Sequence, residues 1–283
     1  MLTCPTKEMI RALVDGYKRG RRSVALVPTM GYLHEGHLAL VRDARKRADK
    51  VVVSIFVNPT QFGPNEDLDT YPRDVERDLA LLEKEGVDGV FVPNVEEMYG
   101  AAGDSYVEVP GLSSILQGDL RPGHFRGVTT VVTKLFNIVH PDMAVFGEKD
   151  YQQLTIIRQM VRDLDMPLEI IGHPTVREDD GLAMSSRNVR LTPEQRADAP
   201  FLNASLNAAE EAAKRSPSVA DLQRLVEETL ESAKTGDVES VDIRDAVTLA
   251  EIEGPLQKPA VVLLAVRFGT VLLIDQRVVS PAA

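Results

Sequence analysis

Two histidines stand three residues apart in the segment PTMGYLHEGH, which covers residues 28–37. Gly31 and Gly36 permit close approach of a ligand to the backbone. If a helix starts here, its first N–H groups and its positive dipole end attract phosphate, and His34 and His37 could donate to charge that develops on a triphosphate. The alternatives are a tight turn with two surface histidines and a zinc site, but the zinc motif of proteases places its histidines four residues apart. We predict a phosphate-binding loop.

Two further polar segments follow apolar runs. FVNPTQF at residues 56–62 contains Gln61, whose amide donates and accepts and so suits a substrate with hydroxyl groups and a carboxylate. FGEKDYQQ at residues 146–153 contains Lys149, a point charge for phosphate, Asp150, an acceptor for ribose hydroxyls, and Gln153, one turn into a helix. The alternatives are a plain strand-ending turn for the first segment and a solvated Lys149–Asp150 pair for the second.

A third segment, LAMSSRN at residues 182–188, combines two hydroxyl groups with an arginine. Such a loop can clamp phosphate oxygens, because the planar guanidinium of Arg187 is always charged, although a capping or ordinary loop role is the alternative. Asp78 is a candidate ligand for nucleotide-bound magnesium, which takes few protein carboxylates; the charged face of a helix is the simpler interpretation. Arg121 is a candidate anion-binding residue in a loop before a helix.

The elements that must position these residues alternate along the first part of the chain. Continuous apolar runs predict strands buried on both faces, and amphipathic stretches between them predict helices. Strand–helix repetition indicates a doubly wound, Rossmann-like parallel sheet with its ligands at the carboxyl ends of the strands. The strands are expected at 23–27, 51–57, 89–92, 142–146 and 168–172, and the helices at 37–48, 72–85, 127–139 and 151–164.

The pattern changes after about residue 176. Helices are expected at 192–215 and 218–234, the first with Thr192 as N-cap and Pro193 as its first residue. Strands are expected at 240–244, 260–268 and 271–274, the last two joined by a hairpin turn at Gly269-Thr270. We therefore predict an α/β domain at residues 1–176 and a smaller α+β domain at residues 177–283.

Composition narrows the class of protein. A net charge of −11 disfavours nucleic acid and anionic membranes as partners. We find no apolar run long enough to span a membrane and no signal-peptide pattern at the N-terminus. The single cysteine, Cys4, cannot form an internal disulfide, and we expect it to be a free thiol near a loose terminus. These features predict a cytoplasmic protein.

Taken together, PTMGYLHEGH, FVNPTQF, RPGHFRGV, FGEKDYQQ and GLAMSSRN resemble the pantothenate synthetase family in order and spacing. The HxGH element alone resembles the wider nucleotidyltransferase superfamily. The resemblance implies an ATP-dependent ligase of pantothenate biosynthesis, a step towards coenzyme A, that joins (R)-pantoate to β-alanine through a pantoyl-adenylate, releasing pyrophosphate and AMP, with Mg²⁺ accompanying ATP. It further implies a homodimer whose C-terminal domain is lid-like.

Site residues carried over by position follow from that resemblance. His37 would be the principal catalytic group with His34 beside it, aided by Lys149, Ser185 and Arg187. Gln61 and Gln153 would bind pantoate, and Gln61 also β-alanine. The expected ATP-binding residues are Met30, Gly31, Tyr32, Leu33, His34, Glu35, Gly36, His37, Gly147, Glu148, Lys149, Asp150, Val176, Met184, Ser185, Ser186 and Arg187.

Two other functions share these features. A nucleotidyltransferase acting on another small acceptor would have the HxGH element and the fold, but would not explain Gln61 together with Gln153. A non-catalytic nucleotide-binding protein of the same fold should have lost a histidine or Lys149, and all three are present.

Overall fold

The computed structural model describes residues 1–64, 66, 68–101 and 103–282. They form two compact units. Unit 1 comprises Met1–Gly147 and Gln152–Pro174, and unit 2 comprises Glu148–Tyr151 and Thr175–Ala283. Unit 1 contains a parallel sheet with helices and unit 2 an antiparallel sheet with helices, which confirms the predicted fold class.

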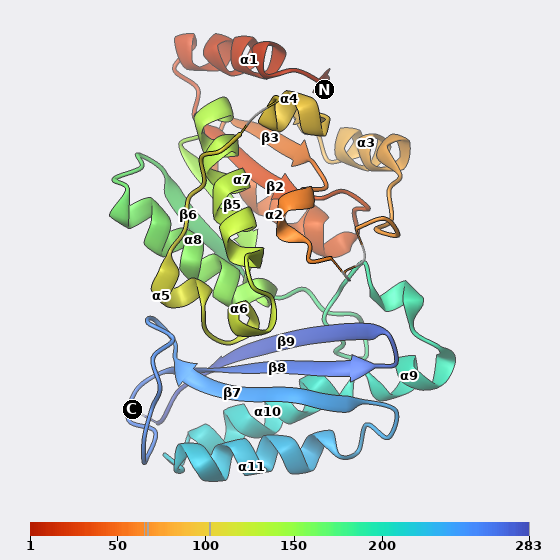
Figure 1. The fold of residues 1–283 in the computed structure, drawn as a ribbon, viewed down its shortest axis with the longest axis vertical. Helices are drawn as coiled ribbons and strands as arrows, with labels where there is room; N and C mark the ends of the chain where they lie inside the picture. Colours follow the sequence, from red (N-terminus) through yellow and green to blue (C-terminus); the bar gives the residue numbers. More distant parts are fainter. Residues whose placement is uncertain (65, 67, 102, 283) are drawn as a thin grey trace. The chain divides into compact units, whose positions relative to one another are not determined.

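An all-parallel sheet organises unit 1 (Figure 1). Its strands, in order across the sheet, are β1 (Leu2–Cys4), β4 (Gly89–Phe91), β3 (Lys50–Ile55), β2 (Val24–Thr29), β5 (Met143–Gly147) and β6 (Glu169–His173). From β2 the chain runs outward to β3 and β4 and then returns to β5 on the other side of β2. The direction of winding thus reverses between β2 and β5, and ligands of such sheets bind beside this point at the carboxyl ends of the strands.

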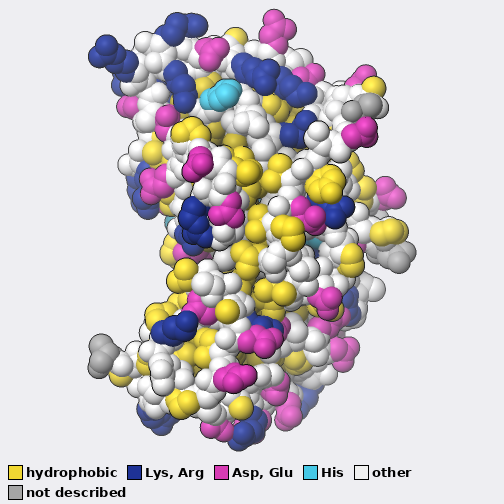
Figure 2. Space-filling model, turned by 60° about the vertical axis from the view of Figure 1, so that its left-hand side comes forward, with side chains coloured by type: hydrophobic (Ala, Val, Ile, Leu, Met, Phe, Trp, Pro, Cys, Tyr) yellow, Lys and Arg dark blue, Asp and Glu magenta, His cyan; other side chains and the backbone are white. Residues whose placement is uncertain are grey.

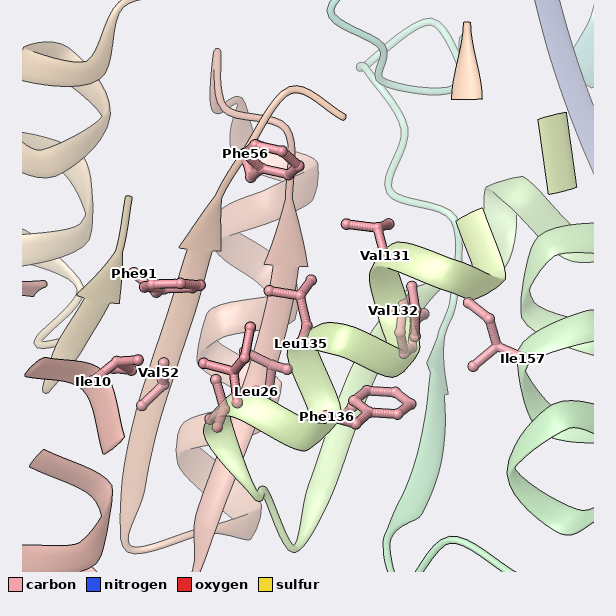
Figure 3. Close-up of a cluster of buried hydrophobic side chains, with 14 of the residues drawn as sticks. Ile10, Leu26, Val52, Phe56, Phe91, Val131, Val132, Leu135, Phe136 and Ile157 are labelled. Atoms are coloured by element: carbon pink, nitrogen blue, oxygen red, sulfur yellow. The ribbon is translucent and has the colours of Figure 1, made fainter. Parts of the chain in front are cut away.

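Two apolar layers enclose this sheet, because successive strand residues point to opposite faces. Leu26 and Val52 belong to the cluster that α1, α7 and α8 cover, whereas Val27 and Val53 belong to the cluster that α2 covers. Figure 3 shows Leu135 of α7 lying over β2, and the Phe136 ring contacts the ring of Phe146 in β5, with the two centroids 6.5 Å apart. The helices of this part of the chain are α1 (Lys7–Arg19), α2 (Glu35–Arg47), α3 (Val75–Lys84), α4 (Val95–Tyr99), α5 (Pro110–Ser113), α6 (Gln117–Leu120), α7 (His124–Val139) and α8 (Tyr151–Asp163).

Three expectations for unit 1 need correction. The strand β1 was not predicted, and Cys4 at its end is fully buried beside Phe91, so the N-terminus is tied into the sheet rather than loose. The helix expected from residue 72 begins only at Val75, because the Asp74 side chain caps it by accepting from Arg77 N–H. The helix expected at residue 37 begins two residues earlier, at Glu35.

Unit 2 contains a meander of β7 (Asp237–Asp245), β8 (Ala260–Phe268) and β9 (Val271–Val279). Helices α10 (Phe201–Ala213) and α11 (Val219–Leu230) share an apolar cluster with one face of it. The expected hairpin turn is present, with Gly269 at φ 60°. The single helix expected at 192–215 is wrong: α9 (Pro193–Asp198) ends before Pro200, which has no N–H to continue the hydrogen-bond ladder.

Charge is unevenly distributed over the surface of unit 1. Figure 2 shows lysine and arginine side chains gathered at the end of unit 1 where α1 lies. Lys18, Arg19, Arg21 and Arg22 precede the start of β2 and so lie at the amino ends of the strands, opposite the edge where ligands of such sheets bind. None of the helices in the described ranges is long and apolar enough to cross a membrane.

Candidate active site

The predicted site residues divide between the units. Unit 1 holds those of the loop after β2 together with Gln61, Asp78, Gly147 and Gln153, and unit 2 holds those at 148–150, 176 and 184–187. The side chains of His34, His37, Gln61, Gln153, Lys149, Ser185 and Arg187 are partly exposed, as groups that meet a ligand must be.

The loop after β2 places both histidines at the start of α2. His34 is the N-cap residue and His37 lies in the first turn. His34 Nδ1 accepts from Gly36 N–H at 3.1 Å, His37 Nδ1 accepts from His34 N–H at 3.3 Å, and the ring centroids are 4.1 Å apart. A nitrogen that accepts carries no proton, so the proton of each ring resides on Nε2. The arrangement makes both Nε2–H groups donors at a helix N-terminus.

Two side chains of α3 hold this loop from behind. Asp78, with no exposed surface, accepts from Tyr32 N–H and Leu33 N–H, both at 2.7 Å, and Arg77 donates to Leu33 O at 3.1 Å. Burial raises the pKa of the Asp78 carboxyl, and the donated N–H groups of Leu33 and Tyr32 act in the opposite direction. This geometry favours a role in shaping the loop over the predicted role as a magnesium ligand.

Gln61 is oriented by a buried neighbour that the sequence analysis did not single out. Asn58, 1 % exposed, donates from Nδ2 to Gln61 Oε1 at 3.1 Å and to Gly127 O at 3.2 Å, and accepts from Tyr99 OH at 2.6 Å. Gln61 Nε2 in turn contacts Met30 Sδ at 3.4 Å. Two predicted site residues, Met30 and Gln61, therefore touch, and the Gln61 amide is fixed with its NH₂ group towards the loop after β2.

An ion pair anchors the loop that follows Gln61. Arg121 makes a paired contact with Glu66, at 2.7 and 2.5 Å, and lies 3.0 Å from His124 Nε2, while His124 Nδ1 lies 2.8 Å from Gln61 O. Since a carbonyl only accepts, His124 Nδ1 carries the proton and Nε2 accepts from Arg121. The guanidinium of Arg121, a candidate for anion binding, is engaged in this structural pair.

Gln153 lies in the first turn of α8, next to a buried anchor. Its neighbour Gln152 is 6 % exposed, donates from Nε2 to Leu112 O and Ile115 O at 3.0 and 2.8 Å, and accepts from Gln117 N–H at 3.2 Å. These bonds fix the start of α8 against the segment containing α5 and α6. The partly exposed Gln153 side chain is thereby presented from a fixed backbone.

In unit 2 the backbone brings together two predicted ATP-binding positions. Met184 N–H donates to Val176 O at 2.9 Å, beside an antiparallel bridge between Arg177 and Ala183. Arg187 N–H donates to Ser185 Oγ at 3.2 Å, which folds residues 185–187 into a turn. The predicted loop at 184–187 is thus the continuation of a short hairpin.

Buried charge secures that hairpin. Arg177 donates to both carboxylate oxygens of Asp275 in β9, at 2.7 and 3.0 Å, and to Gly181 O at 3.1 Å; the Asp275 side chain is 1 % exposed. Arg196 pairs with Asp180 and Glu178 at 2.6 and 2.7 Å. The motifs of the sequence do not indicate these partners, because Asp275 lies 98 residues from Arg177.

Metal-ligating side chains do not cluster. Among the described residues, no group of three or more His, Cys, Asp or Glu side chains could hold a metal ion.

Fold and loop together resemble those of the HxGH nucleotidyltransferases, with a doubly wound sheet and two histidines at the start of the helix that follows β2. The model of the family described as pantoate-beta-alanine ligase matches residues 3–278. The pantothenate synthetase of Desulfitobacterium hafniense is 52 % identical over 281 residues, 99 % of each chain.

Solved structures agree. Pantothenate synthetase from Thermus thermophilus matches with a TM-score of 0.94 and 49 % identity, covering 99 % of this chain and 100 % of that one. The Francisella tularensis pantoate-beta-alanine ligase, solved with "Beta-gamma ATP and Beta-alanine", matches with a TM-score of 0.81 and 32 % identity, covering 98 % and 97 %.

The chain belongs to the pantoate–β-alanine ligase family. The predicted enzyme class and function are confirmed: ATP-dependent condensation of pantoate with β-alanine in pantothenate biosynthesis. Family membership removes the two alternatives, a nucleotidyltransferase for another acceptor and a non-catalytic nucleotide-binding protein.

Proposed function

We propose that the residues of the loop after β2 catalyse the first half-reaction. A pantoate carboxylate oxygen forms a bond to the α-phosphorus of ATP, the bond from that phosphorus to the bridging oxygen breaks, and pyrophosphate leaves. His37, with His34 beside it, donates from Nε2 to phosphate oxygens as their charge increases. The observation that carries this proposal is the pair of engaged Nδ1 atoms, which assigns both protons to Nε2.

Gln61 and Gln153 bind pantoate in this proposal. The Gln61 NH₂ group is directed by Asn58 and contacts Met30 Sδ, a weak acceptor that a substrate oxygen can replace. In the second half-reaction the amine of β-alanine, also near Gln61, attacks the acyl carbon. A C–N bond forms, the acyl–phosphate C–O bond breaks, AMP leaves, and the amine proton passes to the solvent. The Francisella relative was solved in complex with β-alanine.

The remaining predicted residues bind the nucleotide. Lys149, Ser185 and Arg187 neutralise phosphate charge, Asp150 accepts from ribose hydroxyls, and the Val176 backbone contacts adenine. Of the other positions of this set, Gly147 and Glu148 bind ribose and phosphate, and Met184 and Ser186 close over the triphosphate. The partial exposure of Lys149, Ser185 and Arg187 supports these roles. Mg²⁺ accompanies ATP and supplies charge neutralisation on the phosphates when bound.

Several wider properties belong to the same proposal. The chain works as two domains, residues 1–176 and 177–283, supported by a second compact unit that resumes at Thr175. It is a cytoplasmic homodimer that binds neither nucleic acid nor membranes, supported by the net charge of −11 and by a single cysteine that is free.

The test compares His37→Ala with His140→Asn. His140 is exposed at the end of α7, and Asn tolerates its left-handed backbone at φ 50°. Pantoate-dependent pyrophosphate release should fall by about 10²–10³-fold in His37→Ala, the usual loss for one transition-state donor, with the unfolding temperature retained. His140→Asn should behave as the unmodified protein. Near-normal release by folded His37→Ala would remove the assigned role.

A further inference from the structure

The carboxylate of Asp78 occupies an unusual position for an acidic side chain. It is fully buried in α3, and its two oxygens accept separately from successive backbone groups: Oδ2 from Tyr32 N–H and Oδ1 from Leu33 N–H, both at 2.7 Å. Isolated buried carboxylates are strongly disfavoured, and hydrogen bonds to the charged form are what make burial tolerable. The contacts lie in the loop that ends at His34.

That loop has a conformation which requires support. Gly31 has φ 83° and Tyr32 has φ 51°, so two consecutive residues are left-handed. Tyr32 bears a side chain, and such a residue adopts this conformation only at a cost in energy. Successive N–H groups turned to one side form a concavity that binds anions. Here the anion is the Asp78 carboxylate, and a Cβ on Gly31 would lie 3.0 Å from Asp78 Oδ2.

The neighbouring residue completes the support. Arg77 donates to Leu33 O at 3.1 Å, and its guanidinium carbon lies 5.5 Å from the centroid of the Tyr32 ring. Both backbone polar groups of Leu33 are thus held by α3, one by Arg77 and one by Asp78. Because His34 follows directly and is the N-cap of α2, the position of Leu33 determines where both imidazoles lie.

We infer that Asp78 is a positioning residue for the adenylation step: it holds residues 31–33 so that His34 and His37 meet the transition state. It does so through the loop and does not coordinate magnesium. The inference rests on the proposed roles of the two histidines. A magnesium ligand needs an oxygen that can reach the nucleotide, whereas Asp78 is fully buried with both oxygens engaged.

Asp78→Asn is the informative change, because it preserves shape but turns an NH₂ group towards one of the two backbone donors. Asp74→Asn is the matched control. It makes the same chemical change on the same helix at an exposed N-cap, where Asn functions well, and contacts Arg77 N–H rather than the loop. The measurements are kcat and the KM for pantoate, the magnesium dependence of pyrophosphate release, and thermal unfolding.

We expect kcat of Asp78→Asn to fall by roughly ten- to a hundredfold, the scale of a misplacement of about 1 Å. The KM for pantoate should change less than about twofold, because Gln61 and Gln153 lie outside this loop. Excess magnesium should not restore kcat, and Asp74→Asn should match the unmodified protein. Should Asp78→Asn not fold, Arg77→Met is the second variant. It removes a half-exposed side chain and should lower kcat by about three- to tenfold, the effect of one hydrogen bond.

Three results would overturn the inference. The first is an unchanged kcat in folded Asp78→Asn, and the second is recovery of its kcat at high magnesium, which would make Asp78 a metal ligand. The third is an unchanged kcat in Arg77→Met when Asp78→Asn does not fold. Failure of the proposed catalytic roles is distinguishable, because it would appear as a normal kcat in His37→Ala. If His37→Ala is impaired and Asp78→Asn is not, only the positioning role of Asp78 is wrong.

Discussion

Replacing Gly127 by alanine should damage pantoate use more than stability. A Cβ at this position in α7 would press on Thr60 O, and would lie 2.6 Å from Thr60 C and 2.7 Å from Gln61 N. Ordinary van der Waals contact begins at 3.4 Å, so restoring it at Thr60 C requires a shift between α7 and the loop carrying Gln61 equal to the difference between 2.6 and 3.4 Å, which is 0.8 Å. A displacement near 1 Å in a positioned group costs on the order of 10²-fold in rate.

The effect on stability should be smaller, since two contributions oppose each other. Overpacking destabilises by about 1–3 kcal/mol, while alanine stabilises a helix relative to glycine by about 0.5–1 kcal/mol. We therefore expect a folded protein with kcat/KM for pantoate lowered by roughly 30- to 100-fold. The control is Gly111→Ala, at an exposed position in α5 where a Cβ meets nothing within 4 Å.

Steady-state kinetics with varied pantoate, together with thermal unfolding of both variants, measures these effects. Normal pantoate kinetics in folded Gly127→Ala would refute the reasoning that packing of α7 on the loop at 58–61 positions Gln61. An equal loss of kcat/KM in Gly111→Ala would show that the exchange of glycine for alanine causes the effect, and not the contact with the loop that carries Gln61.

Two further predictions concern α8 and unit 2. Gln153→Ala should raise the KM for pantoate by about tenfold with a smaller change in kcat, the loss of one or two substrate hydrogen bonds; Gln159→Ala, on the same helix, is the control, and unchanged pantoate kinetics would remove Gln153 from the site. The Lys258 ammonium and the N–H groups of Thr248 and Val247 hold the pKa of Asp245 well below its usual range. A carboxyl with a depressed folded pKa stabilises the protein above its unfolded pKa, about 3.9, and this contribution is lost as the pH falls through the folded pKa. Asp245→Asn should therefore lower the unfolding free energy by about 1–3 kcal/mol at pH 7 and by progressively less below about pH 4, as measured by denaturant unfolding; a difference independent of pH would contradict the cause.

The sequence predicted β2, β3, β4, β5 and β6 of the parallel sheet within one or two residues, because their continuous apolar runs indicate burial on both faces. The sequence did not predict β1, an edge strand of three residues. Its apolar run is too short to indicate a strand, and its pairing with β4 stabilises it. The sequence pattern also joined α9 to α10, although Pro200 separates them. Apolar patterns along the chain thus predicted the elements that such patterns are sufficient to indicate. They failed for β1, whose formation depends on pairing with a strand that is distant in the sequence.

The candidate site shows the same division. Glycines, histidines and a lysine in short motifs could be proposed from the sequence, because their chemistry depends on residue type and spacing. Their supports could not: Asp78 reaches residues 32 and 33 across 46 and 45 positions, and Asn58 bonds to Gly127 across 69. A buried carboxylate and a surface carboxylate are indistinguishable in sequence, so the role of Asp78 became visible only from its burial and its two N–H donors.

The most direct test of the central claim supplies ATP and magnesium with pantoate and β-alanine, separately and together, and measures pyrophosphate, AMP and pantothenate. We expect pyrophosphate release that requires pantoate but not β-alanine, with AMP and pantothenate appearing only when β-alanine is added. Pyrophosphate release that is independent of pantoate, or AMP formation without β-alanine at the same rate as with it, would contradict the two-step ligase mechanism.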